Sequence, residues 1–256
     1  MSLDELAALA QEFDYKAICM RASQIGVQSP RDRATEAART IAANGLKVSM
    51  VTGDFEVPRN NDRGPDGLRN ITPHLDLAEQ LGSDLIRICM KVEDDIPWAQ
   101  RAADEARERN IRLAHQSHTR SLFETVEGSI RVLRKVDRPN FGIIYEPANW
   151  MLSGQQYGAT AIRQIKPWLF NVYVQNCRIR RNASTTLSTW TNGEVDFDQI
   201  GLWEEGGVDF DEVMTELHAI GYDGYVTVHQ AFAEVMPPRE AVRKSADFLG
   251  PRLAST

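Results

Sequence analysis

One acidic side chain, Glu146, stands at the end of an apolar run and is the residue best placed to do chemistry. The run 140–146 (N-F-G-I-I-Y-E) follows a turn signal and is typical of a strand buried on both faces, and Pro147 ends it. Ligands of α/β folds bind at the carboxyl ends of such strands. A carboxylate there can exchange a proton or bind a cation. The alternative is that Glu146 is a solvated acid at a strand end.

Polar side chains recur at the ends of the other predicted strands. They are Cys19, Arg21, Thr52, Asp54, Lys91, Gln116, His118, Gln175, Asn176, His229 and Gln230. Because parallel strands bring their carboxyl ends to one edge of a sheet, we expect these side chains to converge. Histidine and carboxylate groups can act as acid and base near neutral pH. We therefore predict that Glu146 and His229 carry acid/base chemistry, with His118 and Lys91 in support.

The elements that must position these residues alternate along the whole chain. The predicted strands span residues 15–21, 46–52, 84–91, 111–118, 140–146, 168–176 and 222–230. Predicted helices lie before and between them, beginning with one capped by Ser2 and Glu5 and ending with residues 238–249. Two long polar segments, 53–70 and 177–207, are predicted loops, and the first is a candidate lid.

Strict alternation of helix and strand predicts parallel strands in one α/β domain over residues 1–256. Seven strands are predicted where a barrel of this type has eight, and the chain starts with a helix. We therefore expect the N-terminal strand to be missing or replaced. Side chains, neighbouring strands or a second subunit would then close the gap, and the last possibility favours a homo-oligomer.

Composition narrows the class of protein. A net charge of -7 argues against a nucleic-acid surface, and no apolar run is long enough for a membrane span. The start of the chain, M-S-L-D-E-L, is acidic and unlike a secretory signal. Three cysteines without metal-type spacing fit a reducing cytoplasm. We expect a cytoplasmic protein that binds neither nucleic acid nor membrane.

The order and spacing of these segments resemble the xylose-isomerase-like TIM barrels, which include sugar isomerases and epimerases. The matching segments lie between about residues 3 and 249 and include Y-K-A-I-C-M-R, L-G-S-D-L-I-R-I, I-R-L-A-H-Q-S-H, N-F-G-I-I-Y-E-P-A-N, N-V-Y-V-Q-N and G-Y-D-G-Y-V-T-V-H-Q. The resemblance implies a TIM-barrel-like α/β fold and a sugar or sugar-derived substrate. It also implies a strand before the first helix, which this sequence lacks.

The resemblance further implies one divalent metal held by Glu, Asp, His and Glu at four strand ends. In this chain the four positions carry Gln116, Glu146, Gln175 (or Tyr173 in another register) and His229. Glutamine cannot accept a proton from carbon, so the two-glutamate proton shuttle of the family cannot operate here. The remaining donors suit Mn, Zn or Co better than Mg. The alternative is a polar network without metal, and no organic cofactor is implied.

Five side chains are predicted to contact substrate, namely Arg21, Asn149, Asn176, Arg178 and Trp190. Asn149 matches a family position that touches substrate hydroxyls, an arginine can bind a phosphate or carboxylate, and indole planes stack on sugar rings. Each has a structural alternative. Asn149 can cap the loop after Pro147, loop arginines are often solvated, and Trp190 can pack within its loop or an interface. Likewise, Lys91 can pair with Glu93 or Asp94.

Three functions fit these residues. The first is an isomerase or epimerase that moves a proton next to a carbonyl of a small polyhydroxylated substrate. The second is a dehydratase or lyase acting on a keto-sugar or sugar acid. The third is a barrel that has lost catalysis and serves as a ligand-binding or partner subunit.

Overall fold

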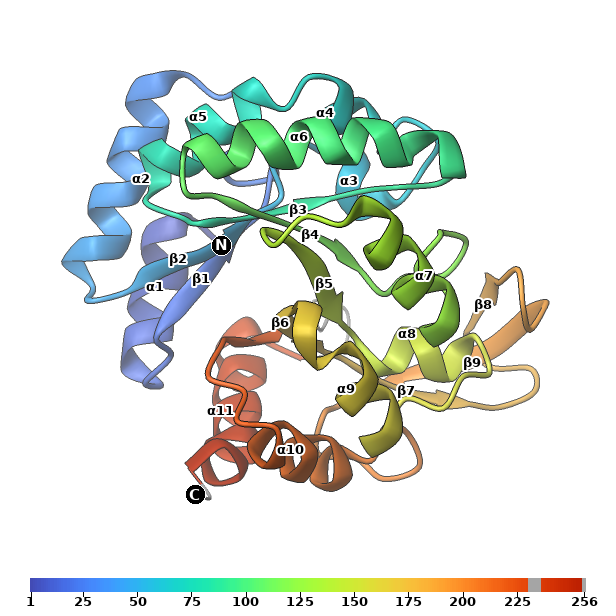
Figure 1. Ribbon diagram of the computed structural model, residues 1–256. Helices are drawn as coiled ribbons and strands as arrows, with labels where there is room; N and C mark the ends of the chain where they lie inside the picture. The colour runs from blue at the N-terminus through green and yellow to red at the C-terminus, as the bar shows by residue number, and fades with distance from the viewer. Residues whose placement is uncertain (230–235, 255–256) are drawn as a thin grey trace. The chain divides into compact units, whose positions relative to one another are not determined.

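The computed structural model describes residues 1–229 and 236–254 (Figure 1). In that part of the chain, parallel strands form a seven-stranded sheet in the order β1-β2-β3-β4-β5-β6-β10. They are β1 (Ala17–Met20), β2 (Lys47–Val51), β3 (Leu85–Ile88), β4 (Arg112–Gln116), β5 (Phe141–Tyr145), β6 (Leu169–Val174) and β10 (Val226–Val228). The α/β class and the seven predicted strands are confirmed. Gln230, predicted to end the last strand, lies outside the described residues.

Helices separate the strands along the chain, as predicted. The longer ones are α1 (Leu3–Glu12), α2 (Arg31–Ala43), α5 (Thr72–Leu81), α6 (Ile96–Glu108), α7 (Val126–Val136), α10 (Phe210–Ala219) and α11 (Pro238–Ala254), and the shorter ones are α8 (Pro147–Leu152) and α9 (Ala159–Ile165). The first helix begins with the predicted capping box between Ser2 and Glu5. No helix among the described residues is both long enough and apolar enough to cross a membrane.

Contacts group the chain into two compact units. Unit 1 comprises Met1–His115 and Lys135–Gly142, and unit 2 comprises Gln116–Arg134 and Ile143–Thr256. The single domain expected from the sequence stays a prediction.

Unit 1 holds β1 to β3 with helices along one side of them (Figure 1). Helix α5 packs on β2, β3 and α2. The buried faces of α2 and α6 are rich in alanine, which lets a helix approach its neighbours closely. Between β2 and α5, the predicted loop 53–70 contains two short helices, α3 (Glu56–Arg59) and α4 (Asp66–Arg69). The Asp54 carboxylate accepts hydrogen bonds from the backbone N–H groups of Glu56 and Val57 and so begins α3.

Two large aromatic side chains pack together in the core of unit 2, one from the end of β5 and one from α8. Tyr145 and Trp150 are fully buried, and their ring centroids lie 5.4 Å apart. Each polar tip has a partner: the Tyr145 hydroxyl donates to the Tyr157 carbonyl (2.6 Å), and the Trp150 indole N–H donates to the Phe123 carbonyl (3.1 Å). Complete burial of both rings makes Tyr145 and Trp150 core residues.

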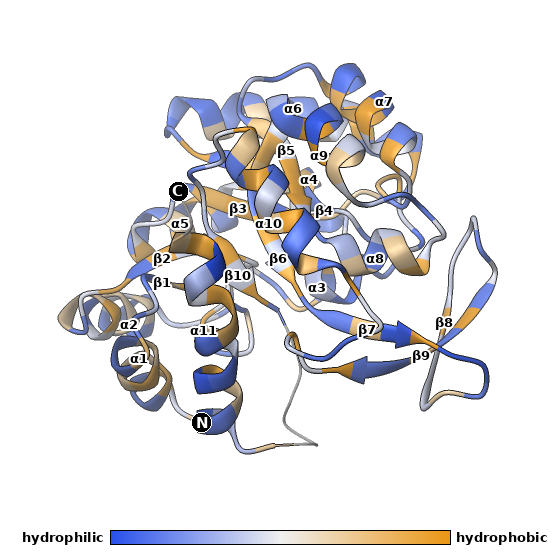
Figure 2. Cartoon of the chain, turned by 90° about the horizontal axis from the view of Figure 1, so that it is seen from below, coloured by the Kyte–Doolittle hydropathy of each residue, from blue (hydrophilic) through white to orange (hydrophobic). Residues whose placement is uncertain are grey.

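The polar segment 177–207 differs from the predicted loop because it contains strands. β7 (Asn176–Ile179), β8 (Thr185–Ser188) and β9 (Glu194–Ile200) form an antiparallel sheet in the order β7-β9-β8. Figure 2 shows hydrophilic residues over much of β7 and β9. Polar strands lack the apolar runs by which the buried strands were recognised. Antiparallel strands can face water, so these hydrogen bonds form without deep burial of side chains.

Candidate functional site

The candidate site is organised around Glu146, which follows β5 and precedes α8 in unit 2. Its side chain is fully buried. Ser117, the residue after β4, fixes its main chain, because Ser117 Oγ accepts a hydrogen bond from Glu146 N (2.7 Å) and donates one to Glu146 O (3.3 Å). Pro147 is the first residue of α8, where a missing N–H costs nothing. The position of the carboxylate is therefore set by backbone hydrogen bonds on both sides of the residue.

Two glutamine amides bind the carboxylate of Glu146. Gln116 Nε2 donates to Oε2, and Gln175 Nε2 donates to Oε1. Gln116 is the last residue of β4 and is itself buried, whereas Gln175 follows β6 and is half-buried. The strand register thus brings Gln175, rather than Tyr173, to the carboxylate. Each carboxylate oxygen accepts one hydrogen bond from a neutral donor.

The imidazole of His229 completes the cluster at the end of β10. Its Nδ1 lies 3.7 Å from Glu146 Oε2, and its side chain is 22% exposed while that of Glu146 is 0% exposed. That separation is too long for a hydrogen bond but is an ion-pair distance when the ring carries a proton. The ring of Tyr173 stacks on the imidazole with centroids 4.3 Å apart and planes 19° apart. Tyr173 therefore holds the ring plane, and His229 is the more accessible member of the pair.

The carboxylate of Glu146 affects the pKa of a neighbouring thiol, that of Cys177. Burial first, and the nearby Glu146 carboxylate second, raise the pKa of Cys177 to about 12. Cys177 is therefore a thiol at neutral pH and is a poor nucleophile or metal ligand there. Glu146 and His229 remain the predicted acid/base groups of this cluster.

Three other predicted residues hold the backbone around this cluster. Asn149 is buried, and its Nδ2 donates to the Ser117 carbonyl (2.9 Å). Asn176 Nδ2 donates to the carbonyls of Gly201 (3.1 Å) and Glu204 (3.0 Å), and its Oδ1 accepts from Val208 N (2.9 Å). The half-buried His118 has its Nδ1 2.9 Å from the Thr119 carbonyl. These contacts are structural, and a substrate or catalytic role for the three residues stays a prediction.

The predicted binding residues Arg178 and Trp190 lie in the segment that carries the antiparallel sheet. The Arg178 guanidinium donates to the Glu205 carbonyl through Nε (3.2 Å) and Nη2 (2.5 Å). The Trp190 side chain is 55% exposed. Its backbone N–H donates to the buried carboxylate of Glu124 (3.0 Å), which also accepts from Thr191 N (2.7 Å). Glu124 therefore anchors the turn that presents Trp190.

Arg21 and Lys91 lie in unit 1. Arg21 is exposed just after β1. Lys91 Nζ donates to the Asn60 carbonyl (2.8 Å), so this ammonium group ties the end of β3 to the segment 53–70. Glu93, considered as a partner of Lys91, accepts from Lys135 Nζ (2.6 Å). The catalytic role of Lys91 and the binding role of Arg21 remain predictions.

Ser117 and Glu124 escaped the reasoning from sequence. Ser117 lies between Gln116 and His118, and successive strand residues point to opposite faces of a sheet. A search for residues that share a face with Gln116 and His118 therefore leaves Ser117 out. Glu124 lies just before α7, which begins at Val126. The spacing of Ser121 and Glu124 is that of a capping pair and was an available signal for a chain turn at this point.

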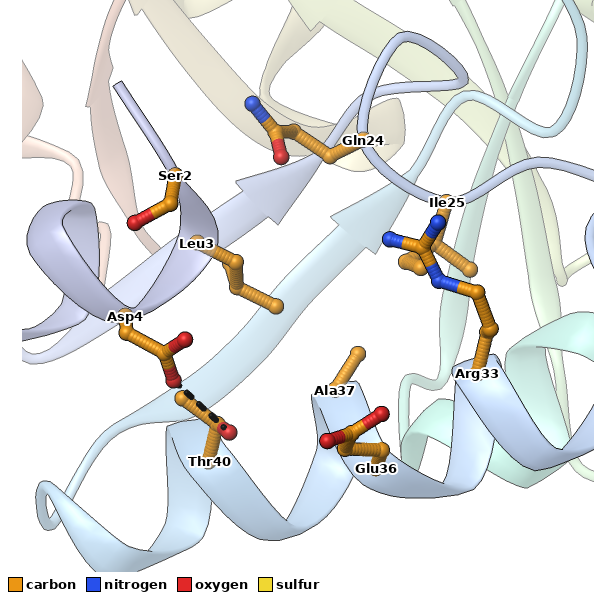
Figure 3. Close-up of a pocket in the computed structure, with 9 residues that line it drawn as sticks. All are labelled: Ser2, Leu3, Asp4, Gln24, Ile25, Arg33, Glu36, Ala37 and Thr40. Carbon is orange, nitrogen blue, oxygen red and sulfur yellow. Dashed lines mark hydrogen bonds between the residues drawn. The ribbon is translucent and has the colours of Figure 1, made fainter.

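A separate hollow of about 280 Å³ lies in unit 1, between the start of α1 and α2 (Figure 3). Arg33 and Glu36 line it from α2, and a hydrogen bond of 3.2 Å joins Thr40 Oγ1 to the Asp4 carboxylate at its edge. The described residues that line this hollow include none of the predicted site residues.

The donor set around Glu146 does not fit a divalent metal. Glu146 is the one carboxylate among the four residues at the predicted metal positions, and the two glutamines present N–H donors to it. A metal needs carboxylate and amide oxygens, and here both glutamines direct an N–H group, not the amide oxygen, at the carboxylate. Among the described residues, no three His, Cys, Asp or Glu side chains are grouped closely enough to hold a metal ion.

Comparison with known proteins gives a family and a fold. A family model described as xylose isomerase-like TIM barrel matches residues 6–252. No curated protein matches the chain in sequence.

Three solved structures illustrate the fold, each with a TM-score of 0.73. The probable 3-DHS dehydratase AsbF involved in petrobactin synthesis from Bacillus anthracis is 15% identical and covers 98% of this chain, which covers 94% of AsbF. A xylose isomerase-like TIM barrel protein from Mycobacterium smegmatis in complex with magnesium is 13% identical, with coverages of 99% and 88%. D-psicose 3-epimerase with D-tagatose from Clostridium cellulolyticum H10 is 12% identical, with coverages of 99% and 94%. At these identities the likeness shows the fold alone.

Proposed function

The chain belongs to the xylose isomerase-like TIM barrel family, and from that premise we propose that it is an enzyme acting on a small polyhydroxylated substrate. The reaction is proton transfer at the carbon next to a carbonyl group, as in isomerisation or epimerisation. A sugar or sugar-derived substrate is supported by the fold and by the solved neighbour that was crystallised with D-tagatose.

The observation that carries this proposal is the pair formed by His229 and Glu146. A half-buried imidazole lies 3.7 Å from a buried carboxylate, and the stacked ring of Tyr173 holds its plane. In this arrangement His229 is the group that takes and returns the proton, through Nε2, the ring nitrogen away from Glu146. The carboxylate orients the ring and stabilises the imidazolium that forms.

The side-chain amides of Gln116 and Gln175 are proposed to recognise the hydroxyl groups of the substrate. Each glutamine amide carries a second N–H and an oxygen beside the hydrogen bond that it makes to Glu146. Amide and carboxylate groups pair with hydroxyls, which a polyhydroxylated substrate offers in number. Trp190, presented on a turn that Glu124 anchors, is proposed to stack on the apolar face of the substrate.

Two alternatives have support of their own. A dehydratase or lyase uses the same first step, removal of a proton next to a carbonyl, and a probable dehydratase shares the fold. A binding subunit without catalysis is supported by the carboxylate itself, because both of its oxygens already accept amide hydrogen bonds. The exchange experiment below separates these functions.

The test is exchange of carbon-bound hydrogen with solvent. The purified chain is incubated in deuterated buffer with ketohexoses, aldopentoses and keto-sugar acids, and deuterium next to the carbonyl is followed by NMR. Exchange with return of a sugar identifies an isomerase or epimerase, and a product that lacks the elements of water relative to the substrate identifies a dehydratase. Removing a general acid/base group costs about 10²–10⁴-fold in rate, so we expect His229→Ala to lose exchange by that factor.

The control is His218→Ala, which removes another histidine of unit 2 whose Nε2 lies 2.8 Å from the Arg252 carbonyl. It should leave exchange within about twofold if the loss reflects the site alone. Absence of exchange across the whole panel, or equal losses in both variants, would overturn the proposed enzyme. Sugar binding without exchange, measured by tryptophan fluorescence, would assign the chain to the binding class.

A further inference from the structure

We infer that the amides of Gln116 and Gln175 take the place of a divalent metal at Glu146, so that the chain binds and orients its ligand without a metal ion. The mechanistic part of this inference rests on the proposed proton transfer, whereas the binding part stands alone. One structural neighbour of the same fold was solved as a magnesium complex, so metal-free binding would set this chain apart from it.

The hydrogen bonds to Glu146 carry the inference. Both carboxylate oxygens accept an amide N–H, one from each glutamine, which uses one lone pair on each oxygen and places donors, not further metal ligands, beside the carboxylate. For the amide oxygens to bind a metal, both side chains would have to turn over. That rotation would break both hydrogen bonds to a carboxylate that is fully buried. The present arrangement already compensates the negative charge with two amide N–H groups, one from each glutamine.

Charge leads to the same conclusion. A divalent ion among Glu146, two neutral amides and a neutral imidazole would leave one net positive charge beside a fully buried residue. Magnesium prefers several oxygen ligands with near-octahedral geometry, and transition metals gain from anionic ligands or several imidazoles. This cluster offers one anion and one imidazole. The glutamines therefore compensate a single carboxylate well and a metal ion poorly.

The backbone around the cluster makes the amide arrangement specific. Gln116 is almost fully buried at the end of β4, and the next residue, Ser117, exchanges hydrogen bonds with the main chain of Glu146. The end of β4 therefore fixes Glu146 twice: Ser117 binds its main chain, and Gln116 donates to its carboxylate. Replacing Gln116 with glutamate keeps the shape and exchanges a donor for a second anion. One substitution should therefore turn the site from a hydrogen-bonded carboxylate into a metal-binding pair.

The experiment measures metal binding directly on the full chain after treatment with a chelator. Manganese(II) is titrated and its free fraction is read by EPR, with magnesium titrated by calorimetry. We expect no saturable manganese binding to the unaltered chain. Gln116→Glu, and Gln175→Glu as a second variant, should each show saturable binding of one manganese ion, because each places a second carboxylate beside Glu146.

The matched control is Gln155→Glu, which adds the same charge to unit 2 at a half-buried glutamine whose Nε2 donates to the Ser153 carbonyl (3.2 Å). Gln155→Glu should show no saturable manganese binding, like the unaltered chain. Circular dichroism of each variant establishes that it is folded. One manganese ion bound to the unaltered chain, and lost in Glu146→Gln, would overturn the inference.

Solvent exchange with and without chelator adds the link to catalysis. Exchange that survives the chelator supports the inference, and exchange abolished by chelator and restored by manganese overturns it. A failure of the proposed function is distinguishable, because it would remove exchange under all conditions and leave the manganese titration as decisive as before.

Discussion

Replacing Gln116 with leucine tests how the buried carboxylate of Glu146 is held. Leucine has nearly the volume of glutamine, so the main loss is one hydrogen bond to an ionised group. Such bonds contribute about 1.5–3 kcal/mol, and we expect Gln116→Leu to lower the free energy of unfolding by about 2 kcal/mol. Gln175 still serves the other oxygen, which keeps the expected loss below that of a fully stranded charge.

The assay is urea unfolding followed by circular dichroism and by tryptophan fluorescence. A loss of stability appears as a lower midpoint at an unchanged slope. For a chain of this length about 2 kcal/mol corresponds to a fall in Tm of roughly 4–8 °C. The control is Gln155→Leu, which removes a hydrogen bond between neutral groups at a half-buried position and should change the free energy of unfolding by less than about 0.5 kcal/mol.

Comparison of the two leucine variants decides whether Gln116 stabilises the buried carboxylate of Glu146. If Gln116→Leu is no more destabilising than Gln155→Leu, Gln116 does not satisfy a buried charge. The account of Glu146 as an amide-bound carboxylate would then be wrong. A second check is the pair Gln116→Leu with Glu146→Leu. Removing both partners should cost less than the sum of the two single losses, because neither of the two residues then leaves the other unsatisfied.

Two further predictions follow from buried titratable groups in the two units. Burial lowers the pKa of His74, against the opposing charge of Asp54 3.7 Å away, so the folded state binds a proton only at lower pH than the unfolded state does. The contribution of His74 to stability is therefore fully present above the ordinary histidine pKa of about 6.5 and is lost as the pH falls below it. His74→Gln should flatten this part of a curve of Tm against pH, measured between about pH 8 and 5. Burial raises the pKa of Cys89 and Cys177 to about 12, so a disulfide reagent at neutral pH should modify the half-buried Cys19 first, and Cys19→Ser should remove the fast phase. Rapid modification of all three thiols in the folded chain would contradict the burial of the other two.

Apolar periodicity was enough to identify the order of the elements. The run Phe141–Tyr145 is buried on both faces, as its unbroken apolar pattern indicates, and the polar residue that follows it is the centre of the candidate site. The antiparallel strands within 177–207 escaped prediction for a matching reason. Hydrogen bonds join β9 to its chain neighbour β8 and to the more distant β7, and a polar sequence does not encode that pairing in its own pattern.

The sequence by itself determined which residue types stand at the strand ends: one carboxylate, two glutamines and a histidine at the four metal positions of the family. Tertiary structure alone decided how they meet. The parallel register brought Gln175 to Glu146 and laid Tyr173 against His229. Side chains two residues apart share a face of a strand, and the neighbouring strand decides what each of them touches.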